Sequence, residues 1–128
     1  MLIRVYYEDT DCGGIVYYAN YLRYFERART EFVREHGFEV AHFAEKGILF
    51  VVGHVEITYL NSARYNDLLE IQTKITELGR ASLTFSHQIH LHGTDRIVVE
   101  GSTQLVCIDS SGKPRRLPQE LLKALGKA

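Results

Sequence analysis

A helical pattern of apolar residues runs between Asn20 and Gly37. These residues recur at spacings of three, four and seven: Tyr21, Tyr24, Phe25, Ala28, Phe32 and Val33. The spacing predicts an α-helix, with Asn20 as its N-cap and Gly37 as the residue that stops it. At about 100° per residue the apolar positions cover nearly half of the helix circumference, so we expect the helix to lie inside something concave.

Apolar and polar residues alternate through most of the remaining chain, as in strands with one buried face. We expect strands over Leu2–Tyr7, His54–Tyr59, Leu69–Thr76, Ala81–Leu91 and Ile97–Ile108, and short helices over Val40–Lys46 and Gln119–Leu125. The connections Leu78–Arg80 and His92–Asp95 are short enough for hairpins, which makes the strands that they join antiparallel. This order of elements predicts an α+β fold, a curved antiparallel five-stranded sheet wrapped around one long central helix.

Two segments of the predicted sheet, Leu49–Val52 and Ile97–Val99, are apolar on both faces. Such segments need cover on both sides. We therefore expect a homo-oligomer, in the form of a dimer of dimers, with active sites near the subunit boundaries.

Length and composition predict a single globular domain over residues 1–128. Fifteen Lys and Arg residues against sixteen Asp and Glu residues give a formal net charge of −1, which argues against binding to nucleic acid or anionic lipid. Two cysteines, Cys12 and Cys107, are too few for a disulfide framework, and no Cys/His ladder indicates a metal. No apolar run suits a signal peptide or a membrane span, so we expect a cytoplasmic protein without membrane insertion.

The densest polar cluster, formed by Glu8, Asp9 and Asp11, lies in a loop that leads to the start of the predicted long helix. Free N–H groups at a helix start can polarise a carbonyl, while an adjacent carboxylate attacks the carbon or deprotonates water. Gly13 and Gly14 allow the backbone to approach closely. The residues alone leave a second interpretation open, in which the aspartates only bind amides of the turn.

The segments Arg4–Tyr21 and Tyr24–Glu31 resemble the signature of hotdog-fold acyl-CoA thioesterases of the 4-hydroxybenzoyl-CoA thioesterase type, and within them the branch associated with the Tol-Pal system. The resemblance is dense over residues 4–31 and continues more loosely to about Asp109. It implies the hotdog fold, dimers and tetramers formed through the sheets, and hydrolysis of acyl-CoA without metal or organic cofactor. Whether coenzyme A or an acyl carrier protein carries the acyl group stays open.

The resemblance can be carried over residue by residue. It implies that Asp11 is the catalytic carboxylate, as nucleophile or general base, and that Asp9 is structural or supports it. The backbone amide of Tyr18 is implied to polarise the thioester carbonyl, although this branch usually has His at that position. Glu26 is the nearest counterpart of a helical carboxylate that a related branch uses. It either faces the site or pairs with Arg29 or Thr30 on the surface, and we favour the surface position.

The phosphates of coenzyme A need cations. Arg80 and Ser82, in a predicted hairpin, match positions where a family member holds the nucleotide. The basic run Lys113–Arg116 is a second candidate for the same phosphates, which guanidinium groups bind well.

The sequence gives weaker evidence for the other candidate functional residues, Cys12 and three histidines. Cys12 could be a nucleophile but has no base beside it in sequence, and His90 and His92 could bind a metal but lack a third ligand. His87 falls in the inward phase of its strand, where a hydrogen-bonded histidine of the core or of an interface is the usual case. Two other classes stay open: a hotdog dehydratase or hydratase, against which Tyr18 counts, and a non-catalytic acyl-binding or scaffold protein.

Overall fold

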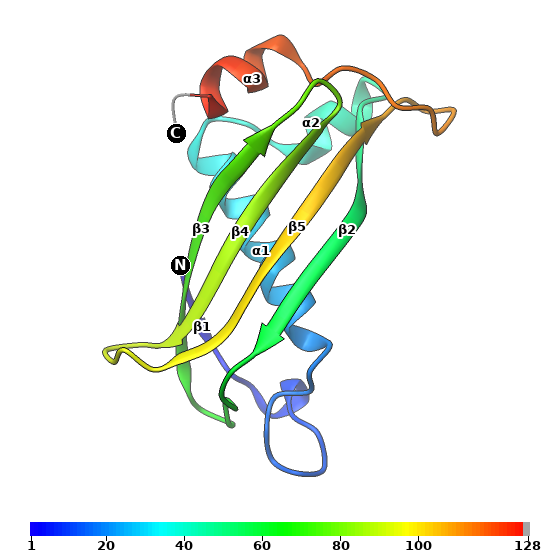
Figure 1. The fold of residues 1–128 in the computed structure, drawn as a ribbon. Coiled ribbons are helices and arrows are strands. Elements are labelled where there is room, and N and C mark those ends of the chain that lie inside the picture. Colours follow the sequence, from blue (N-terminus) through cyan, green and yellow to red (C-terminus); the bar gives the residue numbers. More distant parts are fainter. Residues whose placement is uncertain (127–128) are drawn as a thin grey trace.

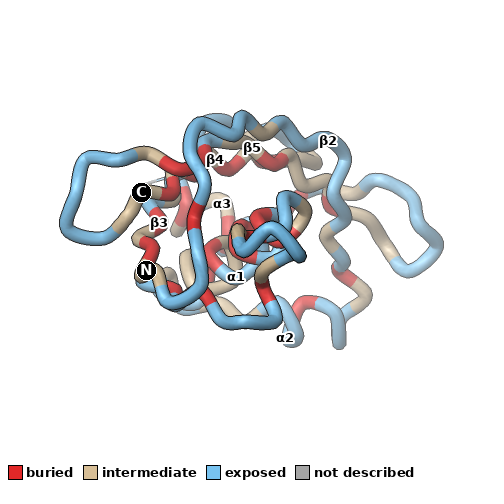
Figure 2. The backbone as a smooth tube through the Cα atoms, turned by 90° about the horizontal axis from the view of Figure 1, so that it is seen from below, coloured by how far each residue is buried: buried red, intermediate tan, exposed pale blue. Residues whose placement is uncertain are grey.

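The structure, a computed structural model, describes residues 1–126. The elements are β1 (Leu2–Arg4), the 3₁₀ turn η1 (Tyr7–Asp9), α1 (Asn20–Glu35), α2 (Val40–Glu45), β2 (Leu49–Tyr59), β3 (Leu68–Leu78), β4 (Ser82–Leu91), β5 (Ile97–Ile108) and α3 (Gln119–Leu125). The strands form one sheet in the order β1-β3-β4-β5-β2, and every neighbouring pair is antiparallel. The sheet curves around α1 (Figure 1, Figure 2), which confirms the predicted α+β arrangement.

The core lies between α1 and the inner face of the sheet. The aromatic rings of Tyr24 and Phe25 are fully buried there, together with apolar side chains of β3, β4 and β5. Gly101 of β5 permits the closest approach, because a Cβ atom at this position would lie 2.6 Å from Cε2 of Phe25. The missing side chain therefore lets the helix pack directly against the backbone of the sheet.

Both ends of α1 are set by particular residues. Gly37 has a φ angle of 91°, and this left-handed conformation ends the helix as predicted. The prediction that Asn20 is the N-cap is wrong, because Asn20 is the first helical residue and its side-chain amide donates to Asp9 instead. The first strand stops at Arg4, earlier than predicted, because the Asp9 carboxylate accepts the Tyr6 N–H and turns the chain into η1.

The segment Ile97–Val99, which is apolar on both faces, is covered by its own chain. Val98 is only 1% exposed, and its carbonyl oxygen accepts the N–H groups of Leu60 and Asn61. Ala63, from the same covering segment, is buried in the same core cluster. A second subunit is therefore not needed to bury this part of the sheet, contrary to the prediction.

The segment at the start of β2 remains exposed. β2 is an edge strand of the sheet, and Val51, Val52 and Val55 are 42%, 54% and 39% exposed. A bulge between Val52 and His54 follows this segment and shifts the alternation of the two faces by one residue from that point on. Within residues 1–126, no helix has the length and apolar character needed to cross a membrane.

Candidate active site

Asp9 fastens the polar loop to the start of α1. Its carboxylate accepts the Tyr6 N–H at 2.9 Å and the Asn20 side-chain amide at 3.2 Å. Its carbonyl oxygen accepts the Tyr17 N–H at 2.9 Å and the Asn20 amide at 3.1 Å. Burial, with the nearby charge of Asp9, raises the pKa of Tyr24. Asp9 is buried and its carboxylate is already hydrogen-bonded, so it holds the loop in place.

Asp11 carries an accessible carboxylate in the part of this loop that follows the η1 turn, and Glu8, within η1, is exposed as well. Asp11 is exposed, and its Oδ1 accepts the Gly13 N–H at 2.8 Å, the turn contact that the second interpretation of the sequence foresaw. Within residues 1–126, its Oδ2 accepts no hydrogen bond. A bridge between Thr10 and Val16 closes the loop, so the carboxylate is held on a short, tied turn with one oxygen available.

Tyr18 presents a backbone donor two residues before α1. Its carbonyl oxygen accepts the Tyr59 hydroxyl at 3.0 Å, which ties the segment to the end of β2. Among the described residues, nothing accepts the Tyr18 N–H. A free N–H at the positive end of a helix dipole is a suitable donor for a carbonyl oxygen that gains negative charge.

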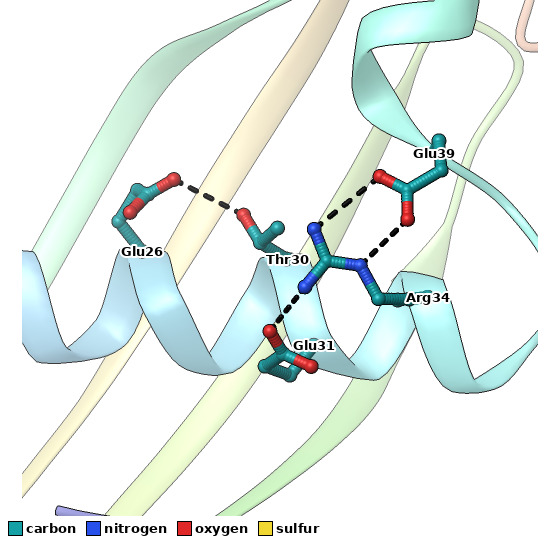
Figure 3. A network of polar contacts seen from close by, with 5 residues as sticks. All are labelled: Glu26, Thr30, Glu31, Arg34 and Glu39. Carbon is teal, nitrogen blue, oxygen red and sulfur yellow. Dashed lines mark hydrogen bonds and ion pairs between the residues drawn. The ribbon is translucent and has the colours of Figure 1, made fainter.

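Glu26 lies on the exposed side of α1 and also reaches a cleft. Its Oε1 accepts the Thr30 hydroxyl at 3.0 Å (Figure 3), which is the surface pairing that we favoured. Within the described chain Glu26 forms no ion pair with Arg29. Further along, Arg34 pairs with Glu31 and with Glu39, the latter at 2.6 Å. The contact with Glu39, the N-cap residue of α2, joins the end of α1 to the start of α2.

An apolar cleft of about 180 Å³ lies beside α1. Its walls come from α1, α2, β2, β4, β5 and α3: Glu26, Arg29, Thr30, Val33, Val40, Phe43, Phe50, Val52, Leu83, Phe85, Leu105 and Leu121. Only the first three of these residues are polar or charged. Glu26, at the near end, lies roughly 9 Å of helix rise from Asn20, so the cleft continues along the helix whose start bears the free amide. No pattern in the sequence predicted this cleft.

Arg80 and Ser82 lie at the other end of the sheet from Asp11 and Tyr18. The β3–β4 turn is beside α3, whereas the loop before α1 is at the opposite end (Figure 1). The two ends of β2 that border these sites, Leu49 and Tyr59, are separated by roughly 30 Å of strand. One copy of the chain therefore does not bring the predicted catalytic and nucleotide-binding residues together.

The two predicted phosphate-binding groups, by contrast, are neighbours. The Arg80 carbonyl oxygen accepts the Leu117 N–H at 2.8 Å, and the Arg115 N–H donates to Cys107 in β5 at 2.9 Å. The basic run Lys113–Arg116 therefore passes beside the β3–β4 turn, and the two candidates form one basic region.

The three histidines of β4 and the turn after it, His87, His90 and His92, each have a partner in the sheet. His87 is 1% exposed, its Nδ1 lies 3.1 Å from the Thr73 hydroxyl, and its ring stacks on Phe25 with centroids 4.5 Å apart. Burial, with the positive charge of Arg29, lowers the pKa of His87 to about 3, so the side chain is neutral. It lies in the core, which is one of the two positions that the sequence predicted.

His90 and His92 both contact Glu70, at 2.9 and 3.6 Å. These contacts lower the pKa of Glu70 although burial opposes the shift. Over residues 1–126 no three His, Cys, Asp or Glu side chains are arranged to hold a metal ion. Cys12 is exposed in the loop.

Comparison with known proteins identifies the family. The sequence model of the thioesterase-like superfamily matches residues 5–125. The acyl-CoA thioester hydrolase YbgC of Escherichia coli O6:H1 is 41% identical over 94% of this chain and 90% of its own length, and Haemophilus influenzae YbgC is 37% identical over 95% and 90%. The DHNA-CoA thioesterase of Staphylococcus aureus is 27% identical, with a TM-score of 0.94 over 99% of this chain and 87% of that one. The chain therefore belongs to the thioesterase-like superfamily and has the hotdog fold of its solved members.

Proposed function

We propose that this protein is an acyl-CoA thioesterase, which hydrolyses an acyl-CoA to a carboxylate and coenzyme A without a metal or organic cofactor. The observation that carries the proposal is one short loop at the start of α1 that holds an exposed carboxylate, Asp11, and an amide donor, Tyr18, with no acceptor among the described residues. Similarity to thioesterases along nearly the whole chain supports it.

The first step is polarisation of the thioester. Its carbonyl oxygen accepts a hydrogen bond from the Tyr18 N–H, and the positive end of the α1 dipole stabilises the negative charge that develops on this oxygen. The donor belongs to the backbone, so Tyr in place of the His that is usual in this branch leaves it unchanged. Because Asp9 and Asn20 hold the loop, the amide is positioned before substrate binds.

Asp11 then acts in one of two ways. As a general base, it takes a proton from water, whose oxygen bonds to the acyl carbon as the C–S bond breaks. As a nucleophile, its carboxylate forms an anhydride with the acyl group, and water hydrolyses the anhydride. In both cases coenzyme A leaves as a thiolate, and with a thiol pKa of about 8.5 it needs no strong general acid.

The oligomer follows from the edge strand β2. An edge of 11 residues with three exposed valines is a template for another strand, and a second copy of β2 is its best complement. Antiparallel pairing about a two-fold axis brings the Tyr59 end of one copy to the Leu49 end of the other. Because Tyr59 holds Tyr18, the loop of each copy then lies beside the cleft of its partner. A dimer of such dimers is the assembly that we propose.

The same pairing unites the two halves of the candidate site. Arg80 and Ser82 of one copy move to the end where Asp11 of the other copy lies, so Arg80, helped by Lys113–Arg116, binds the phosphates while the thioester reaches the loop. The acyl group enters the apolar cleft. An acyl carrier protein can present the same thioester. The free cysteines Cys12 and Cys107 suit a reducing cytoplasm.

Release of thiol from a panel of short, long and aromatic acyl-CoA substrates tests the proposal. Asp11→Asn is expected to lose at least about 10²-fold in kcat, the scale of general base catalysis, with unchanged thermal stability. Asp9→Asn is expected to lose less. If Asp11→Asn turned over at the parental rate, Asp11 would not be the catalytic carboxylate, and Glu26 would be tested next. No hydrolysis of any substrate by the parent would reject the function itself.

A further inference from the structure

Arg29 is a cation in the wall of the apolar cleft with almost no partner in the chain. It is half-buried on α1, and its only hydrogen bond within the described residues is a long one of 3.5 Å from Nη1 to the Thr103 hydroxyl. No carboxylate among residues 1–126 lies within ion-pair distance of it. A guanidinium has five N–H donors, so most of the donor capacity of Arg29 is unused.

The residues around Arg29 offer its guanidinium no contact stronger than the long hydrogen bond to Thr103. Glu26, the only acid in the cleft wall, accepts from Thr30 instead. His87, on the sheet below, is neutral, and the cleft residues from α2, α3, β2, β4 and β5 are apolar. Burial lowers the pKa of Arg29, and the charge of Glu26 opposes this shift only in part. A poorly paired charge in an apolar wall is unfavourable for folding, so stability does not explain Arg29.

The size of the cleft limits what Arg29 can meet there. A cavity of about 150 Å³ with apolar walls binds benzene, and this cleft measures about 180 Å³. It therefore suits an acyl group the size of one aromatic ring or a short chain. Val40 and Phe43 of α2 and Leu121 of α3 contribute to its apolar wall.

We infer that Arg29 is a specificity-determining residue, which donates a hydrogen bond to an uncharged oxygen, such as a hydroxyl, on a short or single-ring acyl group in the cleft. The inference rests on the proposed thioesterase function and adds the substrate class. An uncharged oxygen fits better than a carboxylate, because Glu26 borders the same cleft and repels a second anion. Hydrogen bonding to the oxygen uses donors that the fold leaves free.

The test compares paired substrates that differ by one oxygen: benzoyl-CoA with its hydroxybenzoyl-CoA isomers, and butyryl-CoA with 3-hydroxybutyryl-CoA. The parent is expected to prefer at least one hydroxylated member by about tenfold or more in kcat/KM, the effect of a hydrogen bond to a charged group. Arg29→Met keeps the length of the side chain but has no donors, and it is expected to remove this preference. Arg23→Met, on the exposed side of α1, is the control and keeps it. Succinyl-CoA is expected to gain nothing over butyryl-CoA.

A second measurement separates recognition from a structural role. If Arg29 serves the substrate, Arg29→Met has a melting temperature equal to or above that of the parent, whereas a structural arginine gives a lower one. A parent that hydrolyses both members of every pair equally well, or an Arg29→Met variant that keeps the preference, overturns the assignment and leaves the thioesterase function intact. A parent inactive on every acyl-CoA overturns the function, and this assignment with it.

Discussion

At the scale of single residues, the loop before α1 gives different roles to two aspartates that lie two positions apart in the sequence. Asp9 is buried and bonds backbone and side-chain amides, whereas Asp11 is exposed with one oxygen available. Residue spacing alone does not separate these roles, because both aspartates precede the same glycines. The separation comes from Asn20, whose amide selects Asp9.

The role of the Tyr18 amide can be tested without changing the rest of the loop. Tyr18→Phe keeps the N–H and is expected to retain kcat/KM within a few-fold. Tyr18→Pro removes the N–H and is expected to lose about 10²- to 10³-fold in kcat, as loss of an oxyanion donor does. Circular dichroism and melting temperature check that the proline variant folds. Equal activity of the two variants would show that the amide does not polarise the carbonyl.

His87 predicts how stability depends on pH. Its pKa is about 3 in the folded protein and about 6.5 when unfolded. Between these values the unfolded chain binds one more proton, so the free energy of unfolding falls as pH decreases from 6.5 to 3, by up to about 1.4 kcal/mol per pH unit. Urea unfolding at pH 7 and 4.5 measures this. His87→Gln is expected to lose this part of the dependence, and His54→Gln, an exposed control, to keep it.

At the scale of elements, local signals predicted most of the fold. The left-handed Gly37, the two short hairpin connections and the C-terminal helix Gln119–Leu125 were all found where the sequence placed them. The errors have two kinds of cause. Val98 is covered by a segment nearly forty positions earlier, and Asn20 bonds Asp9 eleven positions earlier, so neither contact has a local signature. The Asp9 contact that ends β1 spans only three residues, but the alternation of residues 2–7 favoured a longer strand.

The sequence likewise predicts only part of the candidate site. Asp11 and Tyr18 come from a continuous motif and could be predicted, although their roles remain proposals. The cleft could not, because its walls come from six separate elements and its volume depends on how they pack. The contact of Glu70 with two histidines was missed because β3 meets β4 only in the folded sheet.

The edge strand β2 gives a prediction about assembly. Light scattering of the parent is expected to show an oligomer at micromolar concentration, and Val55→Lys, which puts a charge on the exposed edge, is expected to shift it towards the monomer and reduce activity. Ser111→Lys adds the same charge in an exposed turn and should change neither property. A monomeric parent would contradict the proposed pairing.

At the scale of the whole molecule, chemistry and substrate recognition lie at opposite ends of the sheet. The loop with Asp11 borders the Tyr59 end of β2, and the basic region around Arg80 borders the other end. A single chain therefore separates the groups that one substrate must meet. Two antiparallel copies bring them together, so each site depends on both subunits.

This arrangement predicts the kinetics of Arg80→Ala. The phosphates are remote from the reacting carbonyl, so KM is expected to rise while kcat stays within a few-fold. Lys123→Ala, on the exposed side of α3, is a matched loss of charge that should leave KM unchanged. An unchanged KM for Arg80→Ala would assign the phosphates to Lys113–Arg116.

The position of β2 at the edge also matters while the chain is being made. Its only partner within the described chain is β5, which begins about 40 residues after β2 ends. At about 5–20 residues per second, a ribosome takes about 2–8 s to add those residues. Because the exit tunnel delays both strands alike, the same interval separates the emergence of β2 from that of β5. During it an 11-residue strand with three exposed valines is outside the ribosome without its partner, alongside nascent chains of the same sequence. We expect overexpression to produce aggregates through β2, and slower translation between the emergence of the two strands to increase them.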